Sequence, residues 1–305
     1  MPRPPISVLV HTYNEADQIA ECLRSVAWAD EIYLLDSFST DRTVEIARET
    51  IPSLHVEQRV SLGSAAQKNY GMDRASHDWI LVIDADERVT AELRDEIIET
   101  LSGSPRNWAY SIGRRNFILG EELRFSGLQR DRVTRLFHRK HARYPNRRVH
   151  ADLVVDGTLG RLREKYLHYY VRSLDHFGEK MTRYGTWGAA QLFLDGRRAS
   201  RYQMLTHPVI RFLRDYILNL GFLDGTIGML SVWMHAYYTF WKYAKLWEYC
   251  QLERAGKPVP LPALDLEAER WLRPWEQRRD QALNVATESP EAAAEAESIA
   301  TKIVS

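Results

Sequence analysis

The 305-residue chain is 45% hydrophobic, enough for one large domain or two smaller ones, each with its own core. Its 41 Lys and Arg residues balance 41 Asp and Glu residues, so the net charge gives no support for nucleic acid as a partner. Cys22 and Cys250 lie far apart without metal-ligand spacing, which argues against a disulfide framework and fits a reducing compartment. No apolar signal-peptide core precedes the first strand, so we expect a cytoplasmic protein.

The first hundred residues alternate short apolar runs with stretches of helical period. This alternation predicts βαβ units around a largely parallel sheet. Asn14 should cap the first helix. The apolar residues of that helix follow the i, i+3, i+4, i+7 rule and are Ile19, Cys22, Leu23 and Val26. We expect strands at residues 6–10, 31–36, 55–60 and 79–84, and further helices at residues 43–49, 65–75 and 92–101.

The second half of the chain changes character after a Gly-Ser-Pro break at residues 103–105. Short strand-like pieces are predicted at residues 108–113, 133–138 and 152–155, and long helices at residues 173–253. The apolar stretch 216–241 contains Asn219, Asp224 and His235, which favours a buried or interfacial helix pair over a spanning helix. Its aromatic residues suit either a membrane-surface helix or an aromatic core.

Polar clusters follow three of the predicted strands, at residues 12–15, 36–41 and 84–86. Because the carboxyl ends of parallel strands meet at one edge of a sheet, these clusters should line a ligand crevice. Helix N-termini that open there would add donors for an anion. Asp84 and Asp86 could hold Mg²⁺ or Mn²⁺ bridged to substrate phosphates, or simply close the strand in a turn. Lys68 is expected nearby, or else is an exposed residue of an amphipathic helix.

Basic residues cluster between residues 130 and 148. They could meet phosphates or anionic lipid, or form a solvated basic face.

The motifs Thr-Tyr-Asn-Glu at 12–15, Asp-Ser-Phe-Ser-Thr-Asp-Arg-Thr at 36–43 and Asp-Ala-Asp at 84–86 together resemble family 2 inverting glycosyltransferases of the GT-A fold. Further stretches are similar to the subgroup that includes bacterial lipopolysaccharide core β-glucosyltransferases. They are residues 22–31, 114–116, 135–137, 148–150 and 221–225.

The resemblance implies an α/β chain with a Rossmann-like, mostly parallel GT-A sheet flanked by helices, and a helical C-terminal extension. The GT-A domain would span residues 1–165, with a nucleotide-sugar half at 1–105 and an acceptor half at 106–165. A helical region at residues 166–275, expected at a membrane surface, and a mobile tail at residues 276–305 would follow.

The same resemblance assigns roles around the donor, a uridine diphosphate sugar. Asp36 would bond the base, and Asp84 would face the ribose or the donor. Asp86 would bind a divalent cation, Mg²⁺ or Mn²⁺, that bridges the diphosphate. The other predicted donor-binding residues are Thr12, Asn14, Glu15 and Lys68.

An inverting transfer also needs a general base for the acceptor hydroxyl. The subgroup usually has His-Glu here, whereas this chain has His150, Ala151 and Asp152, so alanine stands at the expected glutamate position. Asp152 could serve as base after a register change, His150 could be the base or a third metal ligand, or activity could be altered. We predict Asp152 as the base, and a surface aspartate without a role is the alternative.

These assignments predict a metal-dependent hexosyltransferase that moves glucose from UDP-glucose to a lipid-linked saccharide, the lipopolysaccharide inner core. It would act at the inner face of the cytoplasmic membrane, without nucleic acid as a partner. Another glycolipid acceptor, or a non-catalytic scaffold that binds sugar nucleotides at the membrane, are the alternatives. A nucleotidyltransferase is disfavoured because residues 12–15 form no Gly-rich basic loop.

Overall fold

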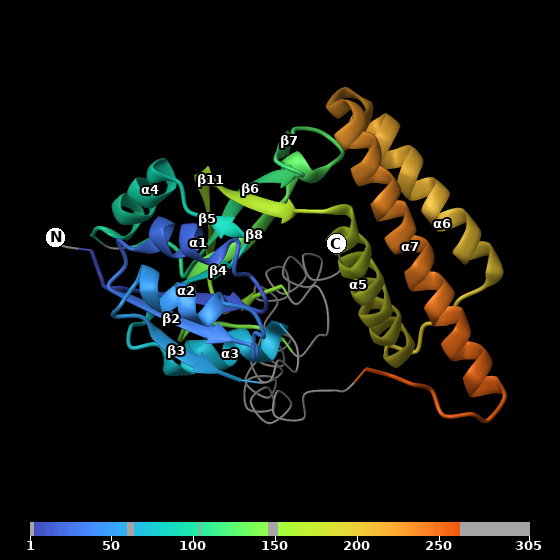
Figure 1. Cartoon of the computed structure of the whole chain (residues 1–305), viewed down its shortest axis with the longest axis horizontal. Coiled ribbons are helices and arrows are strands. Elements are labelled where there is room, and N and C mark those ends of the chain that lie inside the picture. The colour runs from blue at the N-terminus through green and yellow to red at the C-terminus, as the bar shows by residue number, and fades with distance from the viewer. Residues whose placement is uncertain (1–2, 60–63, 104, 146–151, 263–305) are drawn as a thin grey trace, which may run out of the picture. The chain divides into compact units, whose positions relative to one another are not determined.

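The computed structural model describes residues 3–59, 64–103, 105–145 and 152–262. Within these residues one nine-stranded sheet has the order β3-β2-β1-β4-β8-β6-β11-β5, with β7 paired to β6 (Figure 1). Its strands are β1 Ile6–Thr12, β2 Glu31–Asp36, β3 His55–Gln58, β4 Trp79–Asp84, β5 Glu87–Arg88, β6 Ala109–Ile118, β7 Glu121–Leu123, β8 Arg132–His138 and β11 Leu159–Val171. A separate antiparallel pair consists of β9 Ala142–Arg143 and β10 Val154–Val155.

Seven α-helices surround and extend the sheet within the described residues. They are α1 Ile19–Val26, α2 Thr43–Thr50, α3 Ser64–Arg74, α4 Ala91–Leu101, α5 Leu174–Leu194, α6 Arg201–Leu213 and α7 Gly225–Arg254. Three shorter helical turns are η1 Leu128–Arg130, the π-helical η2 Arg214–Leu218 and η3 Gly221–Asp224.

The first four strands of the chain are parallel, as the alternating pattern predicts. The register pairs Thr12 with Asp36 and His11 with Asp84, so the three polar clusters meet at one edge of the sheet. Beyond β4 the sheet is mixed, because β8 is antiparallel to both β4 and β6 while β11 is parallel to β6. The predicted α/β class is confirmed, and the three polar clusters meet on its parallel half.

Both faces of β1 are buried because its side chains alternate between two cores. Val8 and Val10 pack with α1, α2 and α4, whereas Leu9 packs with α3. The predicted buried face of α1 is confirmed. The predicted cap is wrong: α1 begins at Ile19, and Asn14 lies earlier in a left-handed turn with φ 55°. Its short polar side chain tolerates that conformation and bonds the neighbouring loop instead.

The C-terminal helices share a core with the sheet. β11 carries the sheet past residue 165, and α5 begins at Leu174. Ile118 and Val171 at the sheet end pack with Phe177 of α5 and Ile227 of α7. Helix α7 then lies between α5 and α6 (Figure 1). No single helix among the described residues has the length and hydropathy to cross a membrane, although 201–218 and 221–254, bent by 73°, meet that criterion as a pair.

The Gly221–Gly225 segment forms the corner that fixes the start of α7. The carboxylate of Asp224 accepts hydrogen bonds from the backbone N–H groups of Arg124, at 3.0 Å, and Phe125, at 2.9 Å. A Cβ at Gly228 would lie 2.1 Å from the Gly221 carbonyl oxygen, so only glycine fits there. This segment therefore ties α7 to the β7 hairpin. The tail predicted to be mobile, residues 276–305, lies outside the described residues.

Candidate functional site

Two loops at the carboxyl edge of the sheet are joined by hydrogen bonds between backbone and side chains. The N–H of Asn14 donates to the Ser39 hydroxyl at 2.8 Å, and the Asn14 side chain accepts from the N–H of Thr40 at 2.8 Å. The N–H of Ala16 donates to Asp41 at 3.1 Å. The loop after β1 and the loop after β2 therefore form one wall, and Asn14, predicted to bind the donor, holds this wall together.

Asp36 and Thr12 lie side by side at the end of that wall. Asp36 is fully buried and accepts hydrogen bonds from the Ser39 N–H, at 2.9 Å, and from the Gln58 amide, at 2.8 Å. The hydroxyl of Thr12 is buried without a hydrogen-bond partner among the described residues. An unpaired buried hydroxyl is costly unless a water molecule or a ligand satisfies it, so Thr12 stays a candidate contact for the donor.

Asp84 is held by a buried arginine that our sequence reasoning missed. The Nη2 atom of Arg135, on β8, lies 2.5 Å from Asp84 Oδ2 and 2.6 Å from Glu87 Oε1. Lys68, predicted near the donor, lies 4.0 Å from Asp84 Oδ1. Burial alone would raise the pKa of Asp84, but Arg135, Lys68 and His11 hold it well below its usual range. Asp84 is therefore an anion whose orientation is fixed before any ligand arrives.

Glu87 completes this buried network. Its carboxylate accepts from the Asp84 N–H at 3.0 Å and lies 3.5 Å from Arg114 of β6. Both Glu87 and Arg135 are almost inaccessible to solvent. Buried charges of this kind depend on one another, because each lacks water to replace a lost partner.

Most of the described basic residues between 130 and 148 are buried or ion-paired, although Arg130 is exposed. Arg135 is buried in the site. Arg139 and Lys140 pair with Asp78, and Arg143 pairs with Asp73. Only the position of Arg135 between Thr134 and Leu136, on a predicted strand, could have indicated from sequence that it differs from its neighbours.

Asp86 has different partners from Asp84. Its Oδ2 lies 3.5 Å from His168 Nε2 of β11 and 3.5 Å from the ammonium of Lys180 of α5. Burial would raise the pKa of Asp86, but His168 and Lys180 hold it below its usual value. Neither His168 nor Lys180 was predicted. Both reach Asp86 only because β11 and α5 return to this edge of the sheet.

Asp86 and His168 offer two side chains of the kinds that bind divalent cations. His168 Nδ1 lies 2.7 Å from the Asn116 oxygen, so Nδ1 carries a proton that the amide oxygen accepts. A second proton on Nε2 would make His168 a cation that pairs with Asp86, and replacement of that proton by a metal ion would make Nε2 and the Asp86 carboxylate its ligands. Among the described residues no group of three His, Cys, Asp or Glu residues could hold a metal. A cation held by Asp86 and His168 would therefore need oxygens from its substrate as further ligands.

Glu15 links the first loop to α5. Arg172, just before α5, lies 3.0 Å from Glu15 Oε2. Burial, with the negative charge of Asp86 nearby, raises the pKa of Glu15 to about 7, although Arg172 and Lys180 oppose this shift. Glu15, predicted in the nucleoside pocket, is therefore also part of the charge balance around Asp86.

His11 is a second residue that our sequence reasoning missed. Both of its ring nitrogens are buried, and the backbone of Gln67 is the polar group next to the ring. Burial, reinforced by Lys68, lowers the pKa of His11 to about 4, so the ring is neutral at physiological pH. His11 pairs with Asp84 in the β1–β4 register, which places a neutral donor and acceptor next to the carboxylates.

The predicted base is less well defined. Asp152 is exposed and lies two residues before β10. Leu153 and Val155, which follow it, pack against the core that contains Tyr144. No described residue hydrogen-bonds or ion-pairs with the Asp152 side chain. His150 lies outside the described residues. The assignment of either residue as base therefore stays a prediction.

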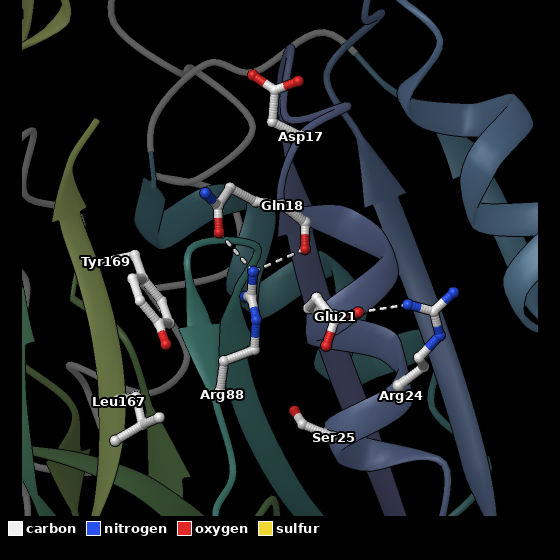
Figure 2. A pocket seen from close by; sticks show the side chains of 8 residues that line it. All are labelled: Asp17, Gln18, Glu21, Arg24, Ser25, Arg88, Leu167 and Tyr169. Carbon is white, nitrogen blue, oxygen red and sulfur yellow. Dashed lines mark hydrogen bonds and ion pairs between the residues drawn. The ribbon is translucent and has the colours of Figure 1, made fainter. Parts of the chain in front are cut away.

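A pocket of about 570 Å³ opens on the α1 side of the turn after β4 (Figure 2). Arg88 crosses it and donates to the carbonyl oxygens of Gln18, at 2.9 Å, and Ala85, at 2.8 Å. Since Ala85 lies between Asp84 and Asp86, Arg88 fastens the carboxylate turn to the start of α1. Neither Asp84 nor Asp86 lines this pocket. Its lining residues are Asp17, Gln18, Glu21, Arg24, Ser25, Arg88, Leu167 and Tyr169.

The chain is similar in sequence to known glycosyltransferases. Residues 7–161, just over half of the chain, match the model of Glycosyl transferase family 2. The lipopolysaccharide core biosynthesis glycosyltransferase LpsC of Rhizobium meliloti is 29% identical over 253 residues, which cover 81% of this chain and 94% of LpsC. An uncharacterized glycosyltransferase of Rickettsia felis is 30% identical over 255 residues, covering 80% of this chain and 89% of the relative.

Solved structures with a similar arrangement are more distant in sequence. Mannosyltransferase PcManGT from Pyrobaculum calidifontis, in complex with GDP-Man and Mn²⁺, is 18% identical, with a TM-score of 0.49 over 81% of this chain and 89% of that one. TarS residues 1–349 from S. aureus, in complex with UDP, are 18% identical, with a TM-score of 0.41 over 83% of this chain and 92% of that one.

Proposed function

Because the chain belongs to glycosyl transferase family 2, we propose that it moves glucose from UDP-glucose to a lipid-linked saccharide. We place the acceptor in the lipopolysaccharide inner core and the reaction at the inner face of the cytoplasmic membrane. The name of LpsC, which this chain matches over 94% of the relative's length, supports a role in lipopolysaccharide core biosynthesis.

The observation that carries this proposal is the difference between the two carboxylates after β4. Asp84 is fixed by Arg135 and Lys68, so it is suited to orient the donor. Asp86 faces the Nε2 of His168, so the two are suited to hold a divalent cation. Asp36 and Thr12 lie at the neighbouring strand ends, where the base and ribose of the donor would be bound. The ends of three strands, β1, β2 and β4, would therefore provide for nucleoside, diphosphate and cation at one edge.

The reaction breaks the bond between the anomeric carbon and the diphosphate while an acceptor oxygen forms a new bond from the opposite face. The negative charge that develops on the leaving diphosphate needs stabilisation. A bound divalent cation supplies Lewis-acid stabilisation of that charge. Lys180, 3.5 Å from Asp86, and Lys68, 4.0 Å from Asp84, add fixed positive charge at the same edge.

The first experiment measures nucleoside diphosphate release by the purified chain from a panel of UDP- and GDP-sugars. We expect release from UDP-glucose with Mn²⁺ or Mg²⁺, suppression by chelator, and an increase when glycolipid acceptor is added. Release from a different sugar nucleotide would correct the donor. Nucleotide binding without release, even with acceptor present, would favour the alternative of a non-catalytic scaffold, which Ala151 motivates.

A second experiment identifies the base. We expect Asp152→Asn to lower kcat by about 10²- to 10⁴-fold with little change in donor affinity, because a general base acts in the transition state. Asp156→Asn, at an exposed carboxylate four residues later, is the matched control and should keep full rate. If His150→Ala loses the rate and Asp152→Asn does not, His150 takes the role. Full activity of both variants would exclude both residues as base.

A further inference from the structure

Helix α6 carries an apolar surface that the rest of the fold leaves uncovered. Tyr202, Leu205, Val209 and Leu213 recur every three or four residues, so they lie along one face of the helix. Tyr202 is 73% exposed and Leu205 is 61% exposed. No residue of α6 is fully buried, so this helix turns its apolar face away from the core.

The surface continues onto its neighbours. Phe212 of α6 contacts the Trp233 ring of α7, with centroids 4.7 Å apart. Trp233 is itself 58% exposed, and Ile217 extends the α6 face into η2. We call this surface the α6–α7 apolar face. It is defined by Tyr202, Leu205, Val209, Leu213, Ile217 and Trp233. An exposed apolar surface of this continuity marks an interaction site in a folded protein.

Positive charges outnumber negative ones beside this face, although Arg198 is paired with Glu253 at 2.7 Å and Asp195 is exposed just before the helix. Residues 196–218 contain five arginines and a single acidic residue, Asp215. Asp215 is buried and ion-paired with Arg211 and Arg214, so it adds no negative charge to the surface. Arg197 and Arg201 are exposed at the start of the helix. The face therefore combines apolar side chains with a cationic border.

We propose that the α6–α7 apolar face binds the surface of a lipid bilayer that contains anionic phospholipid. An amphipathic helix with arginines on its border lies in the plane of such a surface, with Leu, Val and aromatic side chains among the acyl chains. Tyr and Trp suit the interface because each has an apolar ring and a polar group. The proposal rests on the proposed function, in which the acceptor is lipid-linked, and it names the part of the chain that reaches that acceptor's membrane.

A second copy of this chain is a poorer occupant. In a two-fold dimer the same patch meets itself, so the arginine border of one copy would face that of the other. Anionic headgroups instead complement the border. The α6–α7 apolar face is also linked to the candidate site through the helices. Helix α7 packs on α5, and α5 carries Lys180 beside Asp86.

Flotation of the full chain with vesicles tests the proposal. We expect binding to phosphatidylcholine vesicles that contain phosphatidylglycerol, weaker binding to phosphatidylcholine alone, and weakening of the former by salt. The double variant Leu205→Asp with Val209→Asp should raise the lipid concentration for half-maximal binding by about tenfold or more. Leu159→Asp, at an exposed leucine on β11, is the matched control and should bind as the wild type does.

Fluorescence gives a readout that depends on position. Lipids brominated in their acyl chains should quench part of the tryptophan emission, and Trp233→Phe should remove that part. Trp108→Phe, at an exposed tryptophan of the sheet domain, should retain it. Equal flotation of the double variant and the wild type would overturn the proposal. A wild-type dimer that fails to float and that the double variant dissociates would also overturn it, and would make the face a self-association surface.

Donor turnover without vesicles separates this inference from the proposed function. The double variant should release nucleoside diphosphate at the wild-type rate, because its changes lie outside the donor site. If the wild-type chain floats on vesicles but releases no diphosphate, the membrane-docking proposal stands and the proposed function is refuted. If the wild-type chain turns over donor but does not float, the proposed function stands and the membrane-docking proposal is refuted.

Discussion

Asp86→Ala is expected to abolish cation-dependent turnover while the chain stays folded. Asp86 faces the Nε2 of His168 at 3.5 Å, and its pKa is held below its usual value, so it is an anionic ligand at neutral pH. Its loss removes the carboxylate from the cation site, and we expect turnover to fall on the order of 10²- to 10³-fold or more. The measurement is diphosphate release from UDP-glucose as a function of Mn²⁺ concentration.

The stability of this variant should change little, because Lys180 keeps the Tyr170 carbonyl oxygen, at 3.3 Å, as an acceptor. Thermal unfolding checks this point. Asp95→Ala removes an exposed carboxylate on α4 and serves as the control, with turnover and cation dependence unchanged. A variant at Asp86 that still turns over donor in proportion to Mn²⁺ would show that the cation is held elsewhere.

Arg135→Met should cost both stability and activity. Arg135 is the shared partner of Asp84 and Glu87; Arg135 and Glu87 are buried, whereas the Asp84 side chain is 37% exposed. Removing the guanidinium leaves the buried Glu87 carboxylate without its main cation, while water can partly solvate Asp84, so the free energy of unfolding should fall by about 3 kcal/mol. Asp84 would also lose its fixed orientation, so the rate at saturating donor should fall even in the molecules that remain folded.

The pH dependence of this effect has a definite sign. The folded pKa of Asp84 is depressed, so its ion pair stabilises the fold at neutral pH, and this contribution is lost as the pH falls through the folded value. Urea unfolding at neutral pH and at about pH 4, near the ordinary Asp pKa, should therefore give a smaller difference between wild type and variant at the lower pH.

Two controls isolate the role of Arg135. Arg163→Met removes an arginine whose side chain is 84% exposed and should change the free energy of unfolding by less than about 1 kcal/mol. Glu87→Gln in the Arg135→Met background removes one of the stranded charges and should restore part of the lost stability. An Arg135→Met chain as stable and active as wild type would contradict the assigned network.

Sequence periodicity was sufficient for the parallel half of the fold. The apolar runs at 6–10, 31–36 and 79–84 are local signals, and alternation of such runs with helices leaves few possible topologies. The polar residues after these runs were therefore predicted to meet, and the pairing of Thr12 with Asp36 and of His11 with Asp84 confirms this. The family motifs assigned roles to the same positions.

Contacts between residues that are far apart in the sequence could not be predicted from local periodicity. Lys180 follows Asp86 by 94 residues and reaches it only because α5 packs beside β11. Arg135 is one of several basic residues in this part of the sequence, and its place on a predicted strand does not reveal that its guanidinium contacts the buried Glu87. Asn14 has the composition of a helix cap, but its backbone conformation and its bonds to the next loop are set by that loop.

By itself, the sequence determined the parallel βαβ half of the sheet, the edge at which its polar clusters meet and the carboxylates that lie there, because these depend on local periodicity and on short motifs. Only the tertiary structure decided what surrounds each carboxylate. Asp84 is paired with arginine and lysine, Asp86 with histidine and lysine, and α6 is left with an apolar face toward solvent. The physical reason is that charge pairing and burial depend on which distant segments pack together, and no local pattern specifies that packing.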